Sequence, residues 1–338
     1  MPSHKTDKPL IAVTIGDPAG IGPEVVLKAL AQPAVRRACR PVVFGDLGVL
    51  ERTRKKIGSH VRLTSWEPGR SWPDGVPVRS LSALSPAQAK PGVPSRACGA
   101  AVYRYVTEAA RAALAGSVDA IATAPLNKKV LHMAGHRYPG HTELLTEIAG
   151  VPESRMMLLG GRLKVVLVTV HLPLMRVSQQ LDRKKIRVTI ELTDRALKRY
   201  FACRRPRIAV AALNPHAGEE EIFGREERRI ILPAVADAKH RGVAAFGPFP
   251  ADSLFYLAAQ GDYDAVVCMF HDQGLIPLKL HHFIGGVALT LGLPFVRTSV
   301  DHGTAYDIAG KNRADATSMT EAILLAARLA HMTKRRRR

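Results

Sequence analysis

The sequence predicts an α/β protein built on a parallel or mixed β-sheet. Short apolar runs rich in β-branched residues recur along the chain, each is followed by a turn rich in Gly, Pro, Asn or His, and a helical pattern comes next. The expected strands are Leu10–Ile15, Pro41–Phe44, Ala120–Thr123, Val165–Val170, Ile208–Leu213, Ala265–Phe270 and Phe295–Ser299. The expected helices are Pro23–Ala31, Ala100–Ala115, Thr142–Ile148, Asp182–Cys203, Glu226–Arg241 and Ala316–Met332. Residues 66–94, rich in Pro, Ser and Gly, are expected to form an irregular excursion.

The first strand and helix are joined by a glycine-rich turn, GDPAGIGPE, in which Pro23 suits the first helical position. Its glycines permit tight turns and close backbone approach, and the helix start attracts anions. The turn does not match GxGxxG, so the sequence carries no Rossmann fingerprint at this point.

Length and composition favour a two-domain protein in the cytoplasm. A chain of 338 residues with 46% hydrophobic residues has room for more than one core. No apolar run approaches the roughly 18 to 20 residues that a membrane span requires, and the polar start lacks a signal-peptide pattern. The four cysteines are far apart and form no CxxC pair, as in reduced intracellular proteins.

The net charge of +20 raises the alternative of a polyanion-binding protein. Part of this charge is the terminal run 334–338, and much of the rest is scattered along helical stretches. Aromatic residues make up only 5% of the chain, so stacking platforms for single-stranded nucleic acid are not expected. An acidic, phosphorylated small substrate fits the same positive field, and neither nucleic acid nor a membrane is the expected partner.

Three predicted strands end in histidine, at His171, His216 and His271. A single histidine at a strand end usually only bonds a neighbouring loop. Because the carboxyl ends of strands in an open α/β sheet meet at one edge, three of them predict an open divalent metal site for Zn, Co or a similar ion. Asp272 and Asp252 are candidates to orient these ligands, although both also suit ordinary turns and caps.

Further candidate binding residues lie at a helix start and beside a glycine-rich strand. His141 and Thr142 open a predicted helix, and Lys279 and Arg297 flank the strand, where their charges suit phosphate or carboxylate. The polar loop 297–318 is long enough to be functional. A metal-dependent hydrolase or phosphatase using the same three histidines is a second alternative, and the lack of a paired-carboxylate, two-metal cluster counts against it.

Seven motifs occur together and in order: GDPAGIGPE, GHTELL, VTVHLPL, LNPHAGE, FHDQG, LTLGLPFVRTSVDHGTA and DIAGK. Over residues 9–330 the chain resembles the 4-hydroxythreonine-4-phosphate dehydrogenase family. Two of the segments also resemble the isocitrate and isopropylmalate dehydrogenases. The resemblance implies their two-domain α/β/α sandwich, with a terminal domain formed by residues 1–138 plus 285–338, and a central domain, 139–284, carrying metal ligands and a dimer interface.

The resemblance also implies roles for residues at matching positions. His171, His216 and His271 would bind Zn, or Co, Mg or Mn, in a homodimer whose two subunits share the site. The substrate would contact His141, Thr142, Lys279 and Arg297, together with position 288. The cofactor NAD would lie along His302, Gly303, Thr304, Asp307 and Ile308. An Asp at position 307 favours NAD over NADP, because its carboxylate accepts ribose hydroxyls and repels a 2′-phosphate.

The expected reaction is oxidation of the secondary alcohol of 4-phosphooxy-L-threonine in pyridoxal phosphate biosynthesis, with decarboxylation of the keto acid. Asp272, Lys279 and a metal-bound water are all candidates for the general base. One position departs from the family pattern, since Ala288 stands where an Asn is typical. Dehydrogenases of D-threonate or D-erythronate 4-phosphate, or of aromatic cis-dihydrodiol carboxylates, are therefore alternatives.

Overall fold

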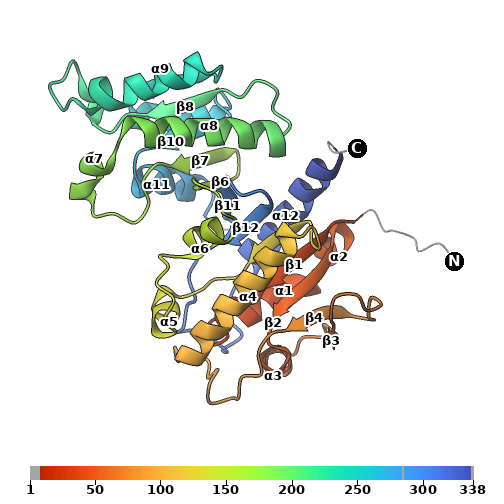
Figure 1. The fold of residues 1–338 in the computed structure, drawn as a ribbon. Helices are drawn as coiled ribbons and strands as arrows, with labels where there is room; N and C mark the ends of the chain where they lie inside the picture. The colour runs from red at the N-terminus through yellow and green to blue at the C-terminus, as the bar shows by residue number, and fades with distance from the viewer. Residues whose placement is uncertain (1–7, 284, 336–338) are drawn as a thin grey trace. The chain divides into compact units, whose positions relative to one another are not determined.

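The chain forms two structural units, one of which is assembled from both ends of the sequence (Figure 1). The computed structural model describes residues 8–283 and 285–335. Within them, unit 1 runs to Pro152 and resumes at Leu293, and unit 2 is Glu153–Gly292. No helix in the described part of the chain has the length and apolar character needed to cross a membrane.

Unit 1 contains a fully parallel sheet in the order β3-β4-β2-β1-β5-β12. Its strands are β1 (Leu10–Thr14), β2 (Arg40–Gly45), β3 (Leu63–Ser65), β4 (Val76–Ser80), β5 (Ala120–Thr123) and β12 (Val296–Val300). Its helices are α1 (Gly22–Ala31), α2 (Pro33–Ala38), α3 (Leu47–Ile57), α4 (Arg96–Leu114), α5 (Lys128–Met133), α6 (His141–Ile148) and α12 (Thr317–Arg335).

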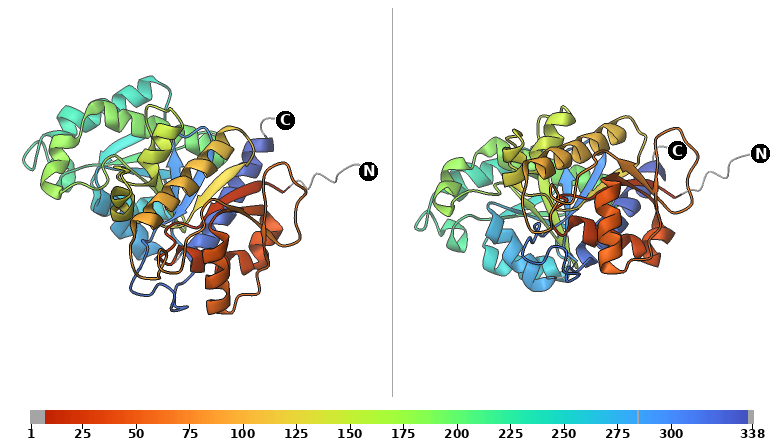
Figure 2. Two further views of the ribbon diagram at one scale, coloured as in Figure 1. Left: turned by 60° about the horizontal axis from the view of Figure 1, so that its bottom comes forward. Right: turned by 90° about the horizontal axis from the view of Figure 1, so that it is seen from below.

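Helices cover both faces of the unit 1 sheet (Figure 2). Helix α4 packs on β1, β2 and β5, and α12 packs on β5 and β12 from the other face, beside α1. Successive side chains of β1 point to opposite faces of the sheet, as the two-residue period of a strand requires, so they pack against helices on both sides. Ala12 joins the core that includes Val102 and Val106 of α4 and Leu144 and Leu145 of α6.

Unit 2 contains a mixed sheet in the order β11-β6-β7-β10-β8-β9. Strands β11 (Val287–Leu291), β6 (Arg155–Gly160) and β7 (Leu163–Leu167) pair antiparallel, and β10 (Ala265–Cys268), β8 (Ile208–Ala211) and β9 (Ala245–Phe249) continue from β7 in parallel. Among its helical segments are η1 (Leu174–Arg176), α7 (Val177–Gln180), α8 (Arg183–Tyr200), η2 (Pro215–Gly218), η3 (Glu227–Ile231), α9 (Leu232–His240), α10 (Ala251–Gln260) and α11 (His271–His281).

The α/β/α fold class predicted from the sequence is confirmed, because each unit has a sheet between helices. The unit boundaries lie later in the chain than the predicted domain boundaries, 138/139 and 284/285. Leu144 and Leu145 pack in the unit 1 core, so residues 139–152 belong with that unit. Strand β11 pairs with β6, so residues 285–292 belong to unit 2.

Several elements differ from the sequence-based expectation. Residues 66–94 are not wholly irregular, because they contain β4, whose central Val78 is fully buried. Strands β6 and β9 and helices α10 and α11 were not expected. The strand expected at Val165–Val170 is β7, which ends at Leu167.

Candidate functional site

The strongest candidate for an anion site in unit 1 combines Arg297 of β12 with the first residues of α6. Arg297 points from β12 and is 2% exposed, and its guanidinium donates to Thr123 Oγ1 on β5 at 2.7 Å. Gly140 precedes His141 and Thr142, the first two residues of α6. The unpaired N–H groups at a helix start favour an anion, and a buried guanidinium adds full positive charge.

Burial controls the electrostatics of this group. Burial and the nearby positive charge of Arg297 hold the pKa of His141 well below its usual range, so the imidazole is neutral at pH 7. Burial lowers the pKa of Arg297 to about 9, although Glu143 opposes the shift, and the guanidinium stays charged at pH 7. His141 Nε2 is buried with no hydrogen-bond partner among the described residues. Such an unsatisfied atom is costly unless a ligand supplies the bond.

The predicted cofactor residues lie in the loop between β12 and α12. Thr304 is buried, whereas Gly303 and Asp307 are exposed and His302 and Ile308 are partly exposed. The carbonyl of Thr304 accepts a hydrogen bond from Ile21 N at 3.0 Å. The start of α1 is therefore covered by this loop and is not open to an anion, contrary to the expectation from the glycine-rich turn.

The three histidines predicted to bind metal all lie in unit 2, at the ends of or after its strands. The rings of His171 and His271 have centroids 5.9 Å apart. The ring of His216 packs 6.2 Å from that of Phe223. Within the described part of the chain, no three His, Cys, Asp or Glu side chains are arranged to hold a metal ion. A single chain thus brings two of the histidines together, and imidazole pairs suit borderline divalent cations such as zinc.

Asp272 contacts one of these histidines. His271 Nδ1 and Asp272 Oδ1 are 2.6 Å apart, at the first turn of α11. When Nδ1–H donates to the carboxylate, the lone pair of Nε2 is left to bind a cation. Asp252, the other predicted orienting carboxylate, is exposed on the first turn of α10.

Sequence reasoning missed a pair of carboxylates that hold the loop around His216. Glu227 is 6% exposed and accepts hydrogen bonds from the backbone N–H groups of Leu213 and Asn214, both at 2.8 Å. Glu226 accepts from Asn214 Nδ2 at 2.9 Å and from Ser178 Oγ at 2.5 Å. The bond from Ser178 is the main reason that the pKa of Glu226 lies below its usual value.

This carboxylate pair supports a strained backbone. His216 has φ 49° and ψ 28°, in the left-handed region that side chains other than glycine rarely adopt. Such conformations persist only where the surroundings hold them, and they cluster at functional sites. The sequence signal was the pair Glu226 and Glu227 in the segment GREER, but its partners could not be known without the loop conformation.

The remaining predicted substrate residues have different surroundings. The ammonium group of Lys279 lies 5.8 Å from the ring centre of Phe283. Ala288 is 4% exposed and belongs to an apolar cluster of unit 2 with Leu158 and Leu278. Its side chain therefore supplies packing and no polar contact.

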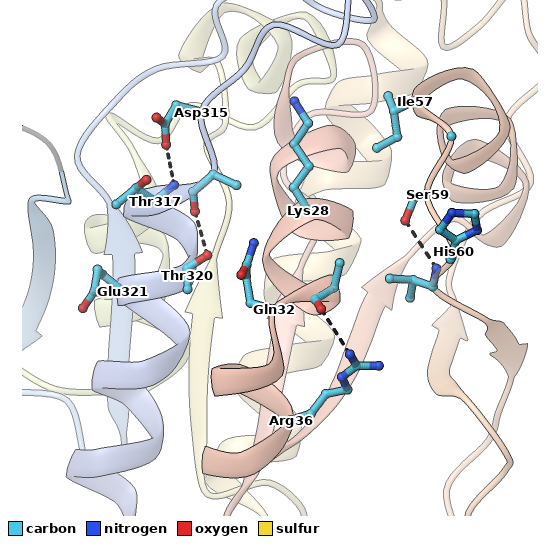
Figure 3. Close-up of a pocket in the computed structure, with 14 residues that line it drawn as sticks. Lys28, Gln32, Arg36, Ile57, Ser59, His60, Asp315, Thr317, Thr320 and Glu321 are labelled. Carbon is cyan, nitrogen blue, oxygen red and sulfur yellow. Dashed lines mark hydrogen bonds between the residues drawn. The ribbon is translucent and has the colours of Figure 1, made fainter.

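A pocket of about 780 Å³ lies elsewhere in unit 1 and is lined by none of the predicted site residues (Figure 3). It lies between α1, the end of α3 and the start of α12. Its cations, Lys28 and Arg36, are matched by the anions Asp315 and Glu321. Lys28 already donates to Glu24 and to the carbonyl of Ala314, and Arg36 donates to the carbonyl of Ala31.

The fold and these motifs define a class of α/β enzymes with a candidate anion site in one unit and a candidate metal site in the other. Residues 37–326 match the family described as pyridoxal phosphate biosynthetic protein PdxA, and the chain belongs to that family.

Curated relatives of the chain carry two different names. A 4-hydroxythreonine-4-phosphate dehydrogenase from Geobacter metallireducens is 53% identical, with 96% of each chain covered. A D-threonate 4-phosphate dehydrogenase from Salmonella typhimurium is 45% identical, with 95% of this chain and 98% of the relative covered. A crystal structure of a 4-hydroxythreonine-4-phosphate dehydrogenase from Klebsiella pneumoniae matches with TM-score 0.86 and 45% identity, covering 95% of this chain and 99% of that one.

Proposed function

We propose that the protein is a metal-dependent, NAD-linked dehydrogenase that oxidises the secondary alcohol of 4-phosphooxy-L-threonine. The observation that carries this proposal is the buried guanidinium of Arg297 near the buried, unsatisfied Nε2 of His141, the first residue of α6. A buried cation beside an unsatisfied imidazole and a helix start suits a small anionic substrate bearing phosphate. The names of the relatives supply the reaction class.

The residues of this chain have distinct roles in the proposed reaction. Arg297 and His141 bind and orient the anionic groups of the substrate, and Asp272 fixes the ring of His271. A divalent cation bound to the histidines would lower the pKa of the substrate hydroxyl and stabilise the charge left on its oxygen. Because Asp272 is engaged by His271, the hydroxyl proton would pass to Lys279 as its neutral amine or to a water molecule. Oxidation β to the carboxylate yields a keto acid that loses carbon dioxide.

NAD is the proposed cofactor, and Asp307 is the residue that selects it. Its carboxylate is exposed on the loop between β12 and α12, where it can accept hydrogen bonds from ribose hydroxyls. A 2′-phosphate at the same place would be repelled. We expect NAD to be preferred over NADP, and a preference for NADP above about tenfold, or 1.4 kcal/mol, would contradict this role.

A homodimer completes the proposed metal site. Each candidate ligand is followed by exposed large apolar side chains: Leu172, Leu174 and Met175 after His171; Ile222 and Phe223 after His216; Ile276, Leu280 and Phe283 after His271. Exposed apolar patches of this kind mark interaction surfaces. A second copy of the chain covering this surface would exclude water and bring its own histidines to the site.

The second candidate is a D-threonate or D-erythronate 4-phosphate dehydrogenase. Ala288 favours it, because its methyl group in an apolar cluster offers no hydrogen bond to an amino group. A cis-dihydrodiol carboxylate is less favoured, because it has no phosphate for a second anion contact.

The deciding experiment is to supply the purified protein with Zn²⁺, Co²⁺, Mg²⁺ or Mn²⁺, add NAD, and measure NADH absorbance with each substrate. We expect turnover of 4-phosphooxy-L-threonine that disappears with a chelator. Turnover of only a sugar-acid phosphate would select the second candidate. Silence across the panel, together with salt-sensitive binding of a polyanion, would support the alternative polyanion-binding protein.

A further inference from the structure

The glycine-rich turn GDPAGIGPE is not used by the proposed reaction, yet its acidic residue is fully buried. Asp17 is 0% exposed and accepts a hydrogen bond from Ala19 N at 2.9 Å. Its other oxygen accepts the hydroxyl of Tyr306 at 2.5 Å. Tyr306 lies in the middle of the loop that carries the predicted cofactor residues. A buried carboxylate that bonds a loop 289 positions away is unexpected for an ordinary turn residue.

The same segment holds the loop at two further points. Upstream of Tyr306, Ile21 N donates to the carbonyl of Thr304 at 3.0 Å, and Gly20 lies so close to Thr304 that a Cβ would be 2.9 Å from its carbonyl oxygen. Downstream, Glu24 is 1% exposed and accepts a hydrogen bond from Ala314 N at 2.9 Å. The loop is therefore fixed before, at and after Asp307.

The loop needs this restraint because part of its backbone is unfavourable. Ala305 has φ 39°, in the left-handed region, and it lies between Thr304 and Tyr306. A residue other than glycine keeps such a conformation only when its surroundings hold it. Burial and the bond from Tyr306 act in opposite directions on the pKa of Asp17, and burial is the larger cause, so the pKa is raised.

We propose that Asp17 and Tyr306 are positioning residues for the dinucleotide, because their hydrogen bond keeps the loop of Asp307 in its binding conformation. This inference rests on the proposed function of that loop. Asp17 and Tyr306 bond each other on the inner side of the loop, whereas Gly303 and Asp307 remain exposed and can contact the proposed dinucleotide. A preformed loop loses less conformational entropy when the cofactor binds, which strengthens binding without adding a contact.

Replacing Tyr306 with Phe tests the proposal with little risk to the fold, because only a hydroxyl is removed. We expect faster amide hydrogen exchange across residues 303–310 in protein without dinucleotide. The Kd for NADH, measured by calorimetry, should rise about 10-fold, as for the loss of a hydrogen bond to a charged group. The KM for NAD should rise by a similar factor while the KM for the phosphorylated substrate stays unchanged. Asp17→Asn should give the same pattern, and the double variant should add little to either single one.

Tyr105→Phe is the matched control. The hydroxyl of Tyr105 is also buried in unit 1 and lies 2.5 Å from Ser82 Oγ, a partner outside the loop between β12 and α12. The Tyr105→Phe variant should leave NADH binding and amide hydrogen exchange in the loop unchanged. If the wild type binds NADH and Tyr306→Phe matches it in both affinity and exchange, the proposal is wrong. If the wild type binds no dinucleotide, the proposed function fails instead, and the exchange comparison still decides whether the bond restrains the loop.

Discussion

The candidate site residues of the two units differ in how far they are buried and held in place. In unit 1, the side chain of Arg297 and the Nε2 atom of His141 are buried, and the loop between β12 and α12 is fixed by hydrogen bonds within the chain. In unit 2, His171 and His216 are exposed, and apolar side chains beside them face outward. The candidate residues of unit 1 are thus held in place by the chain itself, whereas the proposed metal site of unit 2 would need groups from a second copy of the chain.

The largest effect should come from removing a candidate metal ligand. His271→Ala should lose bound metal and reduce kcat/KM by about 10³-fold, since metal stabilisation of charge contributes several kcal/mol. Metal analysis and NADH formation measure both effects. His281→Ala is the control, because His281 is an exposed histidine on the same helix, α11. A His271 variant that keeps full activity without metal would show that the histidines of unit 2 take no part in the reaction.

A charged side chain on the exposed apolar surface of unit 2 should dissociate the proposed homodimer. Leu280 is 88% exposed, so Leu280→Glu should leave the single chain folded. In a dimer the carboxylate would lose water at a cost of several kcal/mol, so the dissociation constant should rise about 10²-fold or more. Light scattering across a dilution series measures this, and bound metal should fall in parallel. Leu114→Glu, at a 44% exposed position of unit 1, should do neither. A wild type that is monomeric at all concentrations would contradict the shared site.

Substitution of the buried cation tests unit 1. Arg297→Met should raise the KM for the phosphorylated substrate about 10- to 100-fold, as expected for charged hydrogen bonds worth about 1.5–3 kcal/mol. The free energy of unfolding should change less than the binding, because the desolvation cost of a buried charge is removed as well. Denaturant unfolding and initial rates give the two values. Arg79→Met removes a unit 1 cation that pairs with Glu108, and it should leave the KM unchanged. If Arg297→Met unfolds the protein without affecting KM in the remaining fraction, the cation is structural.

The smallest effect should be a change in pH dependence from His141. Its pKa is lowered in the folded chain, so below pH 6.5 the unfolded chain gains a proton that the folded chain does not. Stability from this group is thus present at pH 7 and is lost as pH falls, by about 1.4 kcal/mol per unit. His141→Gln should therefore lose less stability than the wild type as the pH is lowered below 6.5. Equal slopes in denaturant unfolding would show that the ring is not buried as a neutral group.

Much of the parallel framework could be predicted from sequence, because buried parallel strands are continuous apolar runs and their ends are marked by turn residues. The strand that ends before His216 and the one that ends before His271 follow this rule. Strands β6 and β11 do not, since their antiparallel pairing depends on contacts distant in the sequence. The boundaries between the units depend on the same contacts.

Residue type and position at a strand end were enough to predict which residues belong to the candidate site, but not their burial or their partners. Arg297 and His141 could be named, but their burial could not. The roles of Asp17 and Glu227 were not predictable, because each acts through backbone or side-chain groups placed by irregular loops. Carboxylates in such loops look like ordinary turn residues in a sequence.

The origin of unit 1 in both ends of the chain has a consequence for synthesis on the ribosome. Unit 2 is continuous, so it can begin to fold once Gly292 has left the exit tunnel. Strand β12 and helix α12 come last, and they bring Arg297 and the cofactor loop with them. A nascent chain therefore presents the three histidines of unit 2 before Arg297 and the loop after β12 have been made, so the proposed anion and dinucleotide sites of unit 1 can form only after unit 2 has been synthesised.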